Sequence, residues 1–298
     1  MSFTDSLASY ELPPALVRPA LRACRGFNTS LDTVFYDTPA LRGDVDLSAD
    51  VDPEGSLLLV DPTSAPYIKA WKDVVAFIKS QTAAPEPVSV ASITGVGSSA
   101  LGSAALAWNV AVGLNRPVLA IVPGYGLADV VLQGLGGWFG FGLHDFLGTK
   151  SHVQNILALV APRTAAIGRH LSESAPGAVR VNGAPVFRTG CGSSDVMHDL
   201  MERLAIDCVV GHSKGALAIG NALHGLPVGR TQGVKVVTLG CPIAEDAPGA
   251  DHHQFLGWFD ALGALNSWGN KPNAWVASDH STNVSIPLSM VAETLVAR

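Results

Sequence analysis

Gly211-His212-Ser213-Lys214-Gly215 is the stretch of sequence that decides how this chain is expected to fold. It follows an apolar run, residues 206–210, that is typical of a buried strand, and it precedes a run of small residues, 216–219, that is typical of a helix. A strand, a sharp G-x-S-x-G turn and a helix form the setting of a nucleophile elbow, in which the helix N-terminus can stabilise an oxyanion. We therefore expect Ser213 to be a nucleophile. The alternative is a strand-to-helix turn in which Ser213 only caps the helix.

Strands and helices are expected to alternate on both sides of this turn. The pattern predicts strands at residues 57–60, 88–94, 117–122, 206–210, 234–239, 254–259 and 274–277, and helices at residues 67–79, 100–112, 151–171, 194–204 and 286–296. Such alternation predicts an α/β fold, with a mainly parallel central sheet that carries helices on both faces.

Two stretches lie outside this alternation. Residues 1–55 contain many Pro, Asp and Gly, and we expect them to form an irregular N-terminal arm. Residues 127–190 are longer than an ordinary crossover, which predicts a cap-like insertion, or lid, over one end of the sheet. Residues 56–298 are otherwise expected to form one domain.

The composition narrows the classes of protein to which the chain can belong. It has 298 residues, a formal net charge of −6, 48% apolar residues and only 15% charged residues, which is ample material for a large core. No basic stripe is present, so a nucleic-acid partner is not expected. No uninterrupted apolar run approaches the ~20 residues of a membrane span. The first residues lack the features of a signal peptide and the four cysteines lack metal-type spacing, so we expect a reduced cytoplasmic protein without a metal site.

A serine nucleophile needs a base, and His280 is the residue expected to supply it. In the elbow architecture the chain order is nucleophile, acid, histidine. His224 falls on the helix that leaves the elbow, whereas His280 follows the last short strand and precedes the terminal helix. His252 and His253 precede a predicted strand. A loop at the end of the last strand is where the base is expected, which favours His280.

The acid is expected between Ser213 and His280, where the candidates are Glu245, Asp246, Asp251 and Asp260. Asp260 ends the apolar run 255–259, so it is expected at the carboxyl end of a buried strand, where the sites of open parallel sheets lie. There it can fix the tautomer of the imidazole. Asp246 follows the preceding predicted strand and is the alternative. We favour Asp260.

Two backbone donors are expected to bind the oxyanion of the tetrahedral intermediate. One is the N–H of Lys214, directly after the nucleophile, and the other is the N–H of Val96, within the glycine-rich segment 95–98. The glycines of this segment do not have the spacing of a dinucleotide-binding loop, and no acidic residue follows about 20 residues later. No organic cofactor is therefore expected.

Together these stretches resemble the α/β-hydrolase family from about residue 56 onward. Residues 94–99, Thr-Gly-Val-Gly-Ser-Ser, are similar to its oxyanion loop, usually H-G-x-G-S-S, with Thr94 in place of histidine. Residues 122–126, Val-Pro-Gly-Tyr-Gly, are similar to a strand end written D-x-P-G-x-G, residues 211–215 match the elbow, and residues 238–242 resemble the strand that follows it in many lipases. The resemblance implies an α/β-hydrolase fold and a catalytic triad of Ser213, Asp260 and His280. The interval between the acid and the base is short for the family.

The predicted insertion suggests which substrates the site accepts. Trp138, Phe139 and Phe141 lie among glycines, which predicts a mobile apolar flap that binds acyl chains or a lipid–water interface. The alternatives are that these aromatic residues belong to a buried loop, or that they form a dimer interface in a homo-oligomer.

The leading hypothesis is a serine hydrolase that cleaves carboxylic esters, like a lipase or esterase, with a small or lipid-like ester as substrate. A thioesterase or an intracellular polyester depolymerase uses the same triad and is the alternative. A third hypothesis is a binding module built on a catalytically inert hydrolase fold.

Overall fold

A computed structural model of the chain gives the fold against which these predictions can be examined. The described residues are 29–42, 47, 55–71, 74–81, 84, 86–95, 98–123, 179–181, 184–186, 192–224, 226–245, 247–267 and 269–298. Most of the predicted insertion lies outside them, as do Val96, Asp246, Trp138, Phe139 and Phe141.

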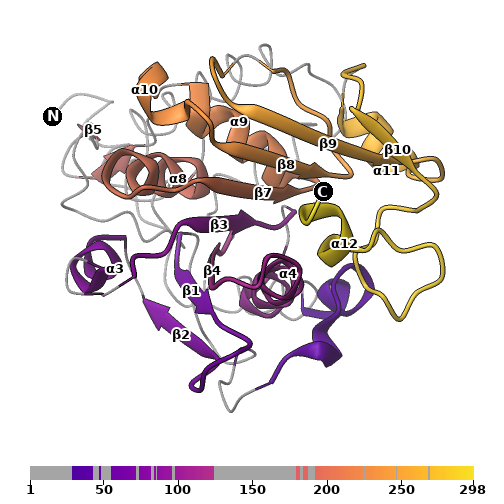
Figure 1. The fold of residues 1–298 in the computed structure, drawn as a ribbon, viewed down its shortest axis with the longest axis horizontal. Coiled ribbons are helices and arrows are strands. Elements are labelled where there is room, and N and C mark those ends of the chain that lie inside the picture. The colour runs from indigo at the N-terminus through magenta and orange to yellow at the C-terminus, as the bar shows by residue number, and fades with distance from the viewer. Residues whose placement is uncertain are drawn as a thin grey trace, which may run out of the picture.

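In the described part of the chain, an 8-stranded sheet has the order β10-β9-β8-β7-β3-β4-β1-β2 (Figure 1). Its strands are β1 (Leu57–Val60), β2 (Ile68–Trp71), β3 (Val90–Ile93), β4 (Val118–Ile121), β7 (Cys208–His212), β8 (Lys235–Leu239), β9 (Asp251–Gly257) and β10 (Ala274–Val276). Every neighbouring pair from β10 to β4 is parallel, whereas β1 pairs antiparallel with both β4 and β2. The prediction of an α/β fold with a mainly parallel sheet is confirmed, and one edge of the sheet is antiparallel.

Helices cover both faces of this sheet. The helices are α3 (Val74–Gln81), α4 (Ala100–Leu114), α8 (Gly192–Arg203), α9 (Lys214–His224), α10 (Val228–Thr231), α11 (Ala261–Asn266) and α12 (Ala292–Val296). Side chains of α3, α8 and α9 pack on one face, with Ala91 and Ile93 of β3, whereas α4 and α12 pack on the other, with Val90. Because successive strand residues point to opposite faces, each apolar strand contributes side chains to the hydrophobic core on either face of the sheet.

The predicted helix at 67–79 is wrong in its first part. Residues 68–71 form β2, in which Ile68 lies opposite Val60 and Trp71 lies opposite Leu57. Helix α3 begins only at Val74. The spacing of Ile68 and Trp71 suits one face of a helix, but pairing with β1 satisfies the backbone groups of this segment and overrides that local pattern.

The predicted helix at 286–296 is also shorter than expected, because α12 covers only its last part. The preceding residues return to the loop that carries His280: Met290 N–H donates to the carbonyl of Ser281, and Asp279 N–H donates to that of Leu288. Proline at position 287 and the positive φ of 65° at Leu288 are incompatible with a continuous helix there. Strand β9 likewise ends at Gly257, before Asp260, which caps α11.

The N-terminal arm is not irregular throughout. Residues 29–35 are helical, and η1 (Thr38–Ala40) follows as a single 3-10 turn. The sequence offers little apolar periodicity there, so the prediction was wrong at these residues. Residues 179–181 and 184–186 form the hairpin β5–β6 within the predicted insertion.

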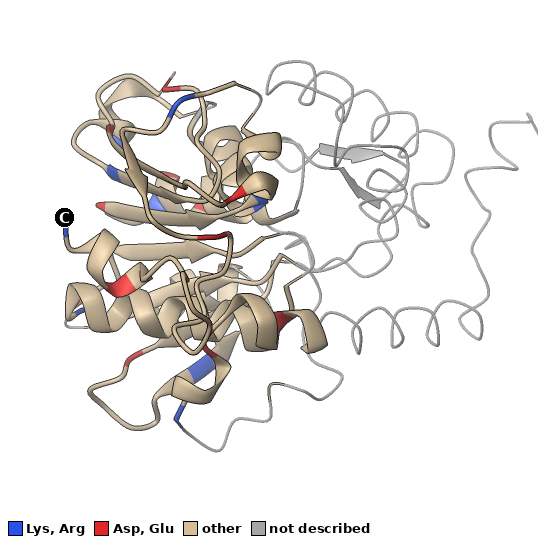
Figure 2. Cartoon of the chain, turned by 90° about the vertical axis from the view of Figure 1, so that its right-hand side faces the viewer, with Lys and Arg blue, Asp and Glu red and all other residues tan. Residues whose placement is uncertain are grey.

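The described surface carries few charges, as the composition requires. Figure 2 shows Lys and Arg of the described residues as scattered, single positions on the side that faces the viewer. Among the described helices, none is both long and apolar enough to cross a bilayer.

Candidate active site

Ser213 lies at the sharp turn between β7 and α9, in a strained backbone conformation. Its φ is +53°, a region that side-chain-bearing residues rarely adopt. The turn is fixed by a hydrogen bond from Ser213 N–H to the carbonyl of Leu239, at 2.9 Å. A Cβ on Gly211 would lie 2.6 Å from Cα of Ala216, and one on Gly215 would collide with the carbonyl of Ile93. Both glycines of the motif are therefore needed for this geometry.

Asp260 and His280 form a buried pair next to this turn. His280 Nδ1 lies 2.8 Å from Oδ1 and 2.9 Å from Oδ2 of Asp260, whose side chain is fully buried. Asp260 also accepts a hydrogen bond from Gly263 N–H at 2.5 Å, which holds the carboxylate at the start of α11. Because a carboxylate only accepts, Nδ1 of His280 carries the proton, and Nε2 remains free to accept one.

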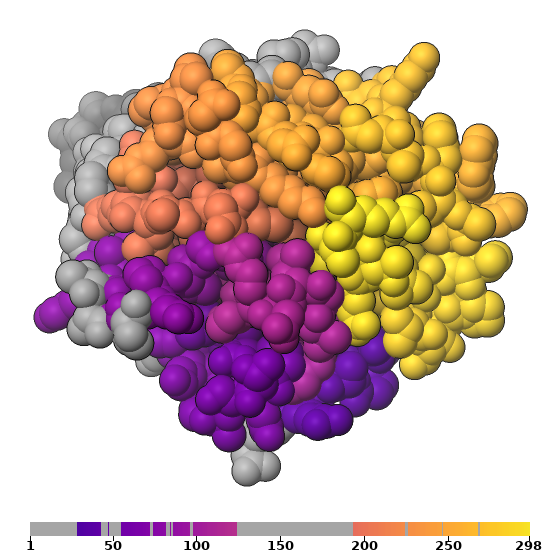
Figure 3. All heavy atoms as spheres, in the orientation of Figure 1, coloured from indigo at the N-terminus to yellow at the C-terminus, as the bar shows by residue number. Residues whose placement is uncertain are grey.

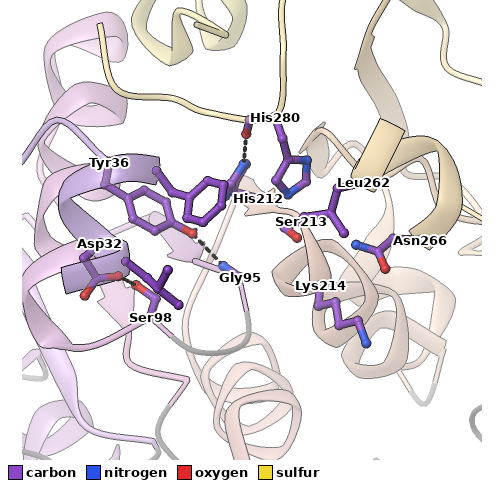
Figure 4. A pocket seen from close by; sticks show the side chains of 12 residues that line it. Asp32, Tyr36, Gly95, Ser98, His212, Ser213, Lys214, Leu262, Asn266 and His280 are labelled. Carbon is purple, nitrogen blue, oxygen red and sulfur yellow. Dashed lines mark hydrogen bonds between the residues drawn. The ribbon is translucent and has the colours of Figure 1, made fainter. Parts of the chain in front are cut away.

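Ser213 and His280 line one pocket of about 260 Å³. Figure 4 shows the His280 ring beside Ser213, with Lys214 and Asn266 on the opposite wall from Tyr36. The other lining residues are Leu31, Asp32, Phe35, Gly95, Ser98, His212 and Leu262. The structure therefore brings together Ser213, Asp260 and His280, which the sequence places in three different loops.

The loop after β3 reaches the same pocket. A Cβ on Gly95 would lie 3.2 Å from Cβ and 3.5 Å from Oγ of Ser213, so the backbone at Gly95 approaches the serine closely. Lys214 is the first residue of α9, and its side chain is largely buried at the pocket. Val96, the other predicted oxyanion donor, is the next residue after Gly95 but lies outside the described residues.

Gly240 leaves the space that the Asp260–His280 pair occupies. Its φ is +68°, and a Cβ there would lie 2.9 Å from Oδ2 of Asp260 and 3.0 Å from Nδ1 of His280. Gly233 has a similar φ of +74°, but a Cβ on it would meet no described atom within 4 Å. The two glycines differ in what surrounds them and not in backbone conformation.

We expect Gly240→Ala and Gly233→Ala each to lose about 1–2 kcal/mol of stability from the left-handed backbone conformation, and Gly240→Ala to lose more because its Cβ would lie 2.9 Å from Oδ2 of Asp260. Gly240→Ala alone should also displace the imidazole of His280 and, for the ester hydrolysis expected from the sequence, lower the turnover of a p-nitrophenyl ester by about 10²-fold. Denaturant unfolding and steady-state kinetics of both variants measure the two effects. Equal activity in the two variants would show that the position of this pair does not matter for the reaction.

Three residues of the site were missed by the sequence analysis. Tyr36 Oη lies 2.8 Å from His212 Nδ1 and accepts a hydrogen bond from Gly95 N–H at 2.9 Å. Asp32 is buried and accepts hydrogen bonds from Ser99, among others. His212 is the variable second residue of the G-x-S-x-G motif, and Tyr36 lies 176 residues before it, so no local pattern signals the contact.

Burial holds His212 in its neutral form. Desolvation, followed by repulsion from His280, lowers the pKa of His212 from 6.5 to about 3. The unfolded chain therefore takes up a proton on His212 as the pH falls below 6.5, whereas the folded chain does so only near pH 3. Stability that is present above pH 6.5 is lost across this window.

We expect the wild-type protein to lose about 2 kcal/mol more stability than His212→Gln between pH 7 and pH 5, because glutamine does not titrate. Denaturant unfolding of both proteins at the two pH values measures the difference. An equal loss in both would contradict the neutral, buried state of His212.

Comparisons of the chain with protein-family models, with curated proteins and with solved structures found no match. Among the described residues, no group of three or more His, Cys, Asp or Glu side chains is arranged to hold a metal ion. Function is therefore inferred from the geometry of the site.

Proposed function

We propose that this chain is a serine hydrolase of the α/β-hydrolase fold that cleaves carboxylic esters. The observation that carries the proposal is the buried Asp260–His280 pair beside Ser213, which stands on a strained strand-to-helix turn. Their order in the chain is serine, acid, histidine, as in nucleophile-elbow hydrolases. They follow β7, β9 and β10, three parallel strands whose carboxyl ends meet at one edge of the sheet.

The reaction begins when Oγ of Ser213 attacks the ester carbonyl carbon while Nε2 of His280 takes the hydroxyl proton. The imidazolium that forms is stabilised by Asp260. Collapse of the tetrahedral intermediate breaks the bond to the alcohol, which leaves with the proton held on His280. Water then attacks the acyl-enzyme, with His280 again as base, and releases the acid and free Ser213.

The oxyanion donors in this proposal are the backbone N–H groups of Lys214 and Val96. The N–H of Gly95 is already donated to Tyr36 Oη. The next N–H along this loop belongs to Val96, which makes it the donor expected from this side. Lys214 is the first residue of α9 and directly follows the nucleophile, which is the position that supplies one oxyanion donor in a nucleophile elbow.

The walls of the pocket support a small, largely apolar acyl group. Leu31, Phe35 and Leu262 contribute apolar surface, and a volume of about 260 Å³ is at the small end for a ligand pocket. Asn266 is 5% exposed, and Figure 4 shows its amide nitrogen directed toward Leu262 and Ser213. This nitrogen can donate to an oxygen of the substrate.

A chain-length series tests the proposed function. We expect p-nitrophenyl acetate and butyrate to be hydrolysed with higher kcat/KM than the octanoate and palmitate, with acyl-CoA thioesters and polyester granules assayed in parallel. A preference for the acyl-CoA thioesters or the polyester granules would favour a thioesterase or a polyester depolymerase that uses the same triad. No turnover of any of these acyl compounds would favour a binding module over an enzyme.

A further inference from the structure

A chain of hydrogen bonds runs through Tyr36 and joins the loops on either side of Ser213. His212 Nε2 lies 2.8 Å from the carbonyl oxygen of His280. A carbonyl only accepts, so Nε2 carries the proton and Nδ1 of His212 is an acceptor. Tyr36 therefore donates its hydroxyl proton to His212 and accepts the N–H of Gly95 (Figure 4). The phenol of Tyr36 thus connects the oxyanion loop, through Gly95, with His212, the residue before the nucleophile. His212 in turn binds the backbone of His280, the proposed base.

The end of the 29–35 helix holds the loop that carries His280 from a second side. The last carbonyls of a helix have no intrahelical partner, and residues 281–283 supply donors to them. The bonds are Asn283 Nδ2 to Thr33 O at 2.8 Å, Ser281 Oγ to Val34 O at 2.8 Å, and Thr282 N and Oγ1 to Phe35 O at 2.8 and 2.9 Å. Figure 3 shows the indigo N-terminal segment packed beside the yellow C-terminal segment.

The same helix also holds the oxyanion loop where that loop enters α4. Asp32 accepts hydrogen bonds from Ser98 Oγ at 2.8 Å, Ser99 N–H at 2.9 Å and Gly102 N–H at 3.2 Å. Asp32 and Tyr36 are one helical turn apart, so they lie on the same side of the segment. One short segment therefore binds the oxyanion loop twice and the base loop at its end.

We infer that Tyr36 is a positioning residue, which sets the oxyanion loop and His280 relative to Ser213 for catalysis; the inference rests on the proposed ester hydrolysis. Tyr36 is 3% exposed, and its hydroxyl bonds to Gly95 N and His212 Nδ1, which belong to residues that line the pocket. Among the described contacts, neither atom has another hydrogen-bond partner. Removing the hydroxyl frees the oxyanion loop from the residue next to the nucleophile. A displacement of about 1 Å at such a site lowers turnover by about 10²-fold.

Tyr36→Phe tests this inference, with Tyr67→Phe as the matched control. Tyr67 loses the same hydroxyl, but its ring packs edge-on against Trp108 and does not line the pocket. We expect Tyr36→Phe to lower kcat for p-nitrophenyl butyrate by about 10- to 100-fold with KM changed less than about threefold, and Tyr67→Phe to stay within about twofold of wild type. Hydrogen exchange of the Gly95 amide should accelerate only in Tyr36→Phe.

A second variant keeps the test decisive if Tyr36→Phe does not fold. His212→Leu removes the acceptor of the same phenol, because leucine has no polar side-chain atom, and it should also lower kcat with a smaller change in KM. The double variant should be no slower than the slower single variant, because both changes break one hydrogen-bond chain. Wild-type kcat in Tyr36→Phe, or additive losses in the double variant, would overturn the inference and leave the hydrolase proposal intact. A wild-type protein that hydrolyses no ester would overturn both, whatever the exchange of Gly95 shows.

Discussion

Ser213→Ala is expected to lower kcat for p-nitrophenyl esters by on the order of 10⁶-fold, the largest effect of any substitution in this chain. The reason is that, among the described residues that line the pocket, no other side chain is placed as Ser213 is, on a turn at φ +53° beside His280. Alanine keeps the Cβ and the same backbone conformation, so the free energy of unfolding should change by less than about 1 kcal/mol. Steady-state kinetics and denaturant unfolding of the variant measure the two quantities.

Ser285→Ala is the control for Ser213→Ala. Ser285 is exposed, and the hydrogen bond it makes to Asn283 uses its backbone N–H and not its hydroxyl. This variant should keep wild-type kcat and stability. Residual turnover above a few per cent in purified Ser213→Ala would mean that the ester is cleaved by another group.

Asp260→Asn is expected to lower kcat by about 10⁴-fold, the second largest effect. The carboxylate now accepts the Nδ1 proton of His280 through both oxygens. An asparagine amide that donates to Nδ1 would move the proton to Nε2, which could then no longer accept the proton of Ser213. KM should change little, because Asp260 is fully buried behind His280 and does not line the pocket.

Asp279→Asn and Asp246→Asn are the controls that show whether the loss in Asp260→Asn comes from its contact with His280 or only from the removal of a negative charge. Asp279 precedes His280 and accepts a hydrogen bond from Ser281 N–H at 2.8 Å, which Asp279→Asn can preserve through its Oδ1. Asp246 was the alternative acid and lies outside the described residues. We expect Asp279→Asn and Asp246→Asn to remain within about tenfold of wild type. A loss of about 10⁴-fold in Asp246→Asn, with an active Asp260→Asn, would reverse the two roles.

Features with local causes were predictable from the sequence. The G-x-S-x-G turn was expected because two positions without side chains are needed between a buried strand and a helix, and Gly211 and Gly215 leave no space for a Cβ. Alternating apolar strands and helices predicted the parallel sheet. The position of Asp260 near a strand end and of His280 after the last short strand placed both at the same edge of the sheet.

Features that depend on distant contacts were not predictable. Residues 68–71 form a strand because they pair with β1. Residues 286–291 are not helical, because they form backbone hydrogen bonds with the loop around His280. Tyr36 and Asp32 carry no motif, and their roles depend on loops that lie far away in the sequence. A polar residue in an N-terminal segment is usually solvated, so only tertiary structure distinguishes these two from their neighbours.

Labelling with a fluorophosphonate followed by peptide mapping distinguishes a nucleophilic Ser213 from a structural one, because the probe reacts readily with a serine that a base and an oxyanion site activate. We predict one adduct per chain on Ser213, none in Ser213→Ala, and slow labelling in Asp260→Asn. A folded wild-type protein that leaves Ser213 unmodified, or that reacts at a different residue, would contradict this prediction.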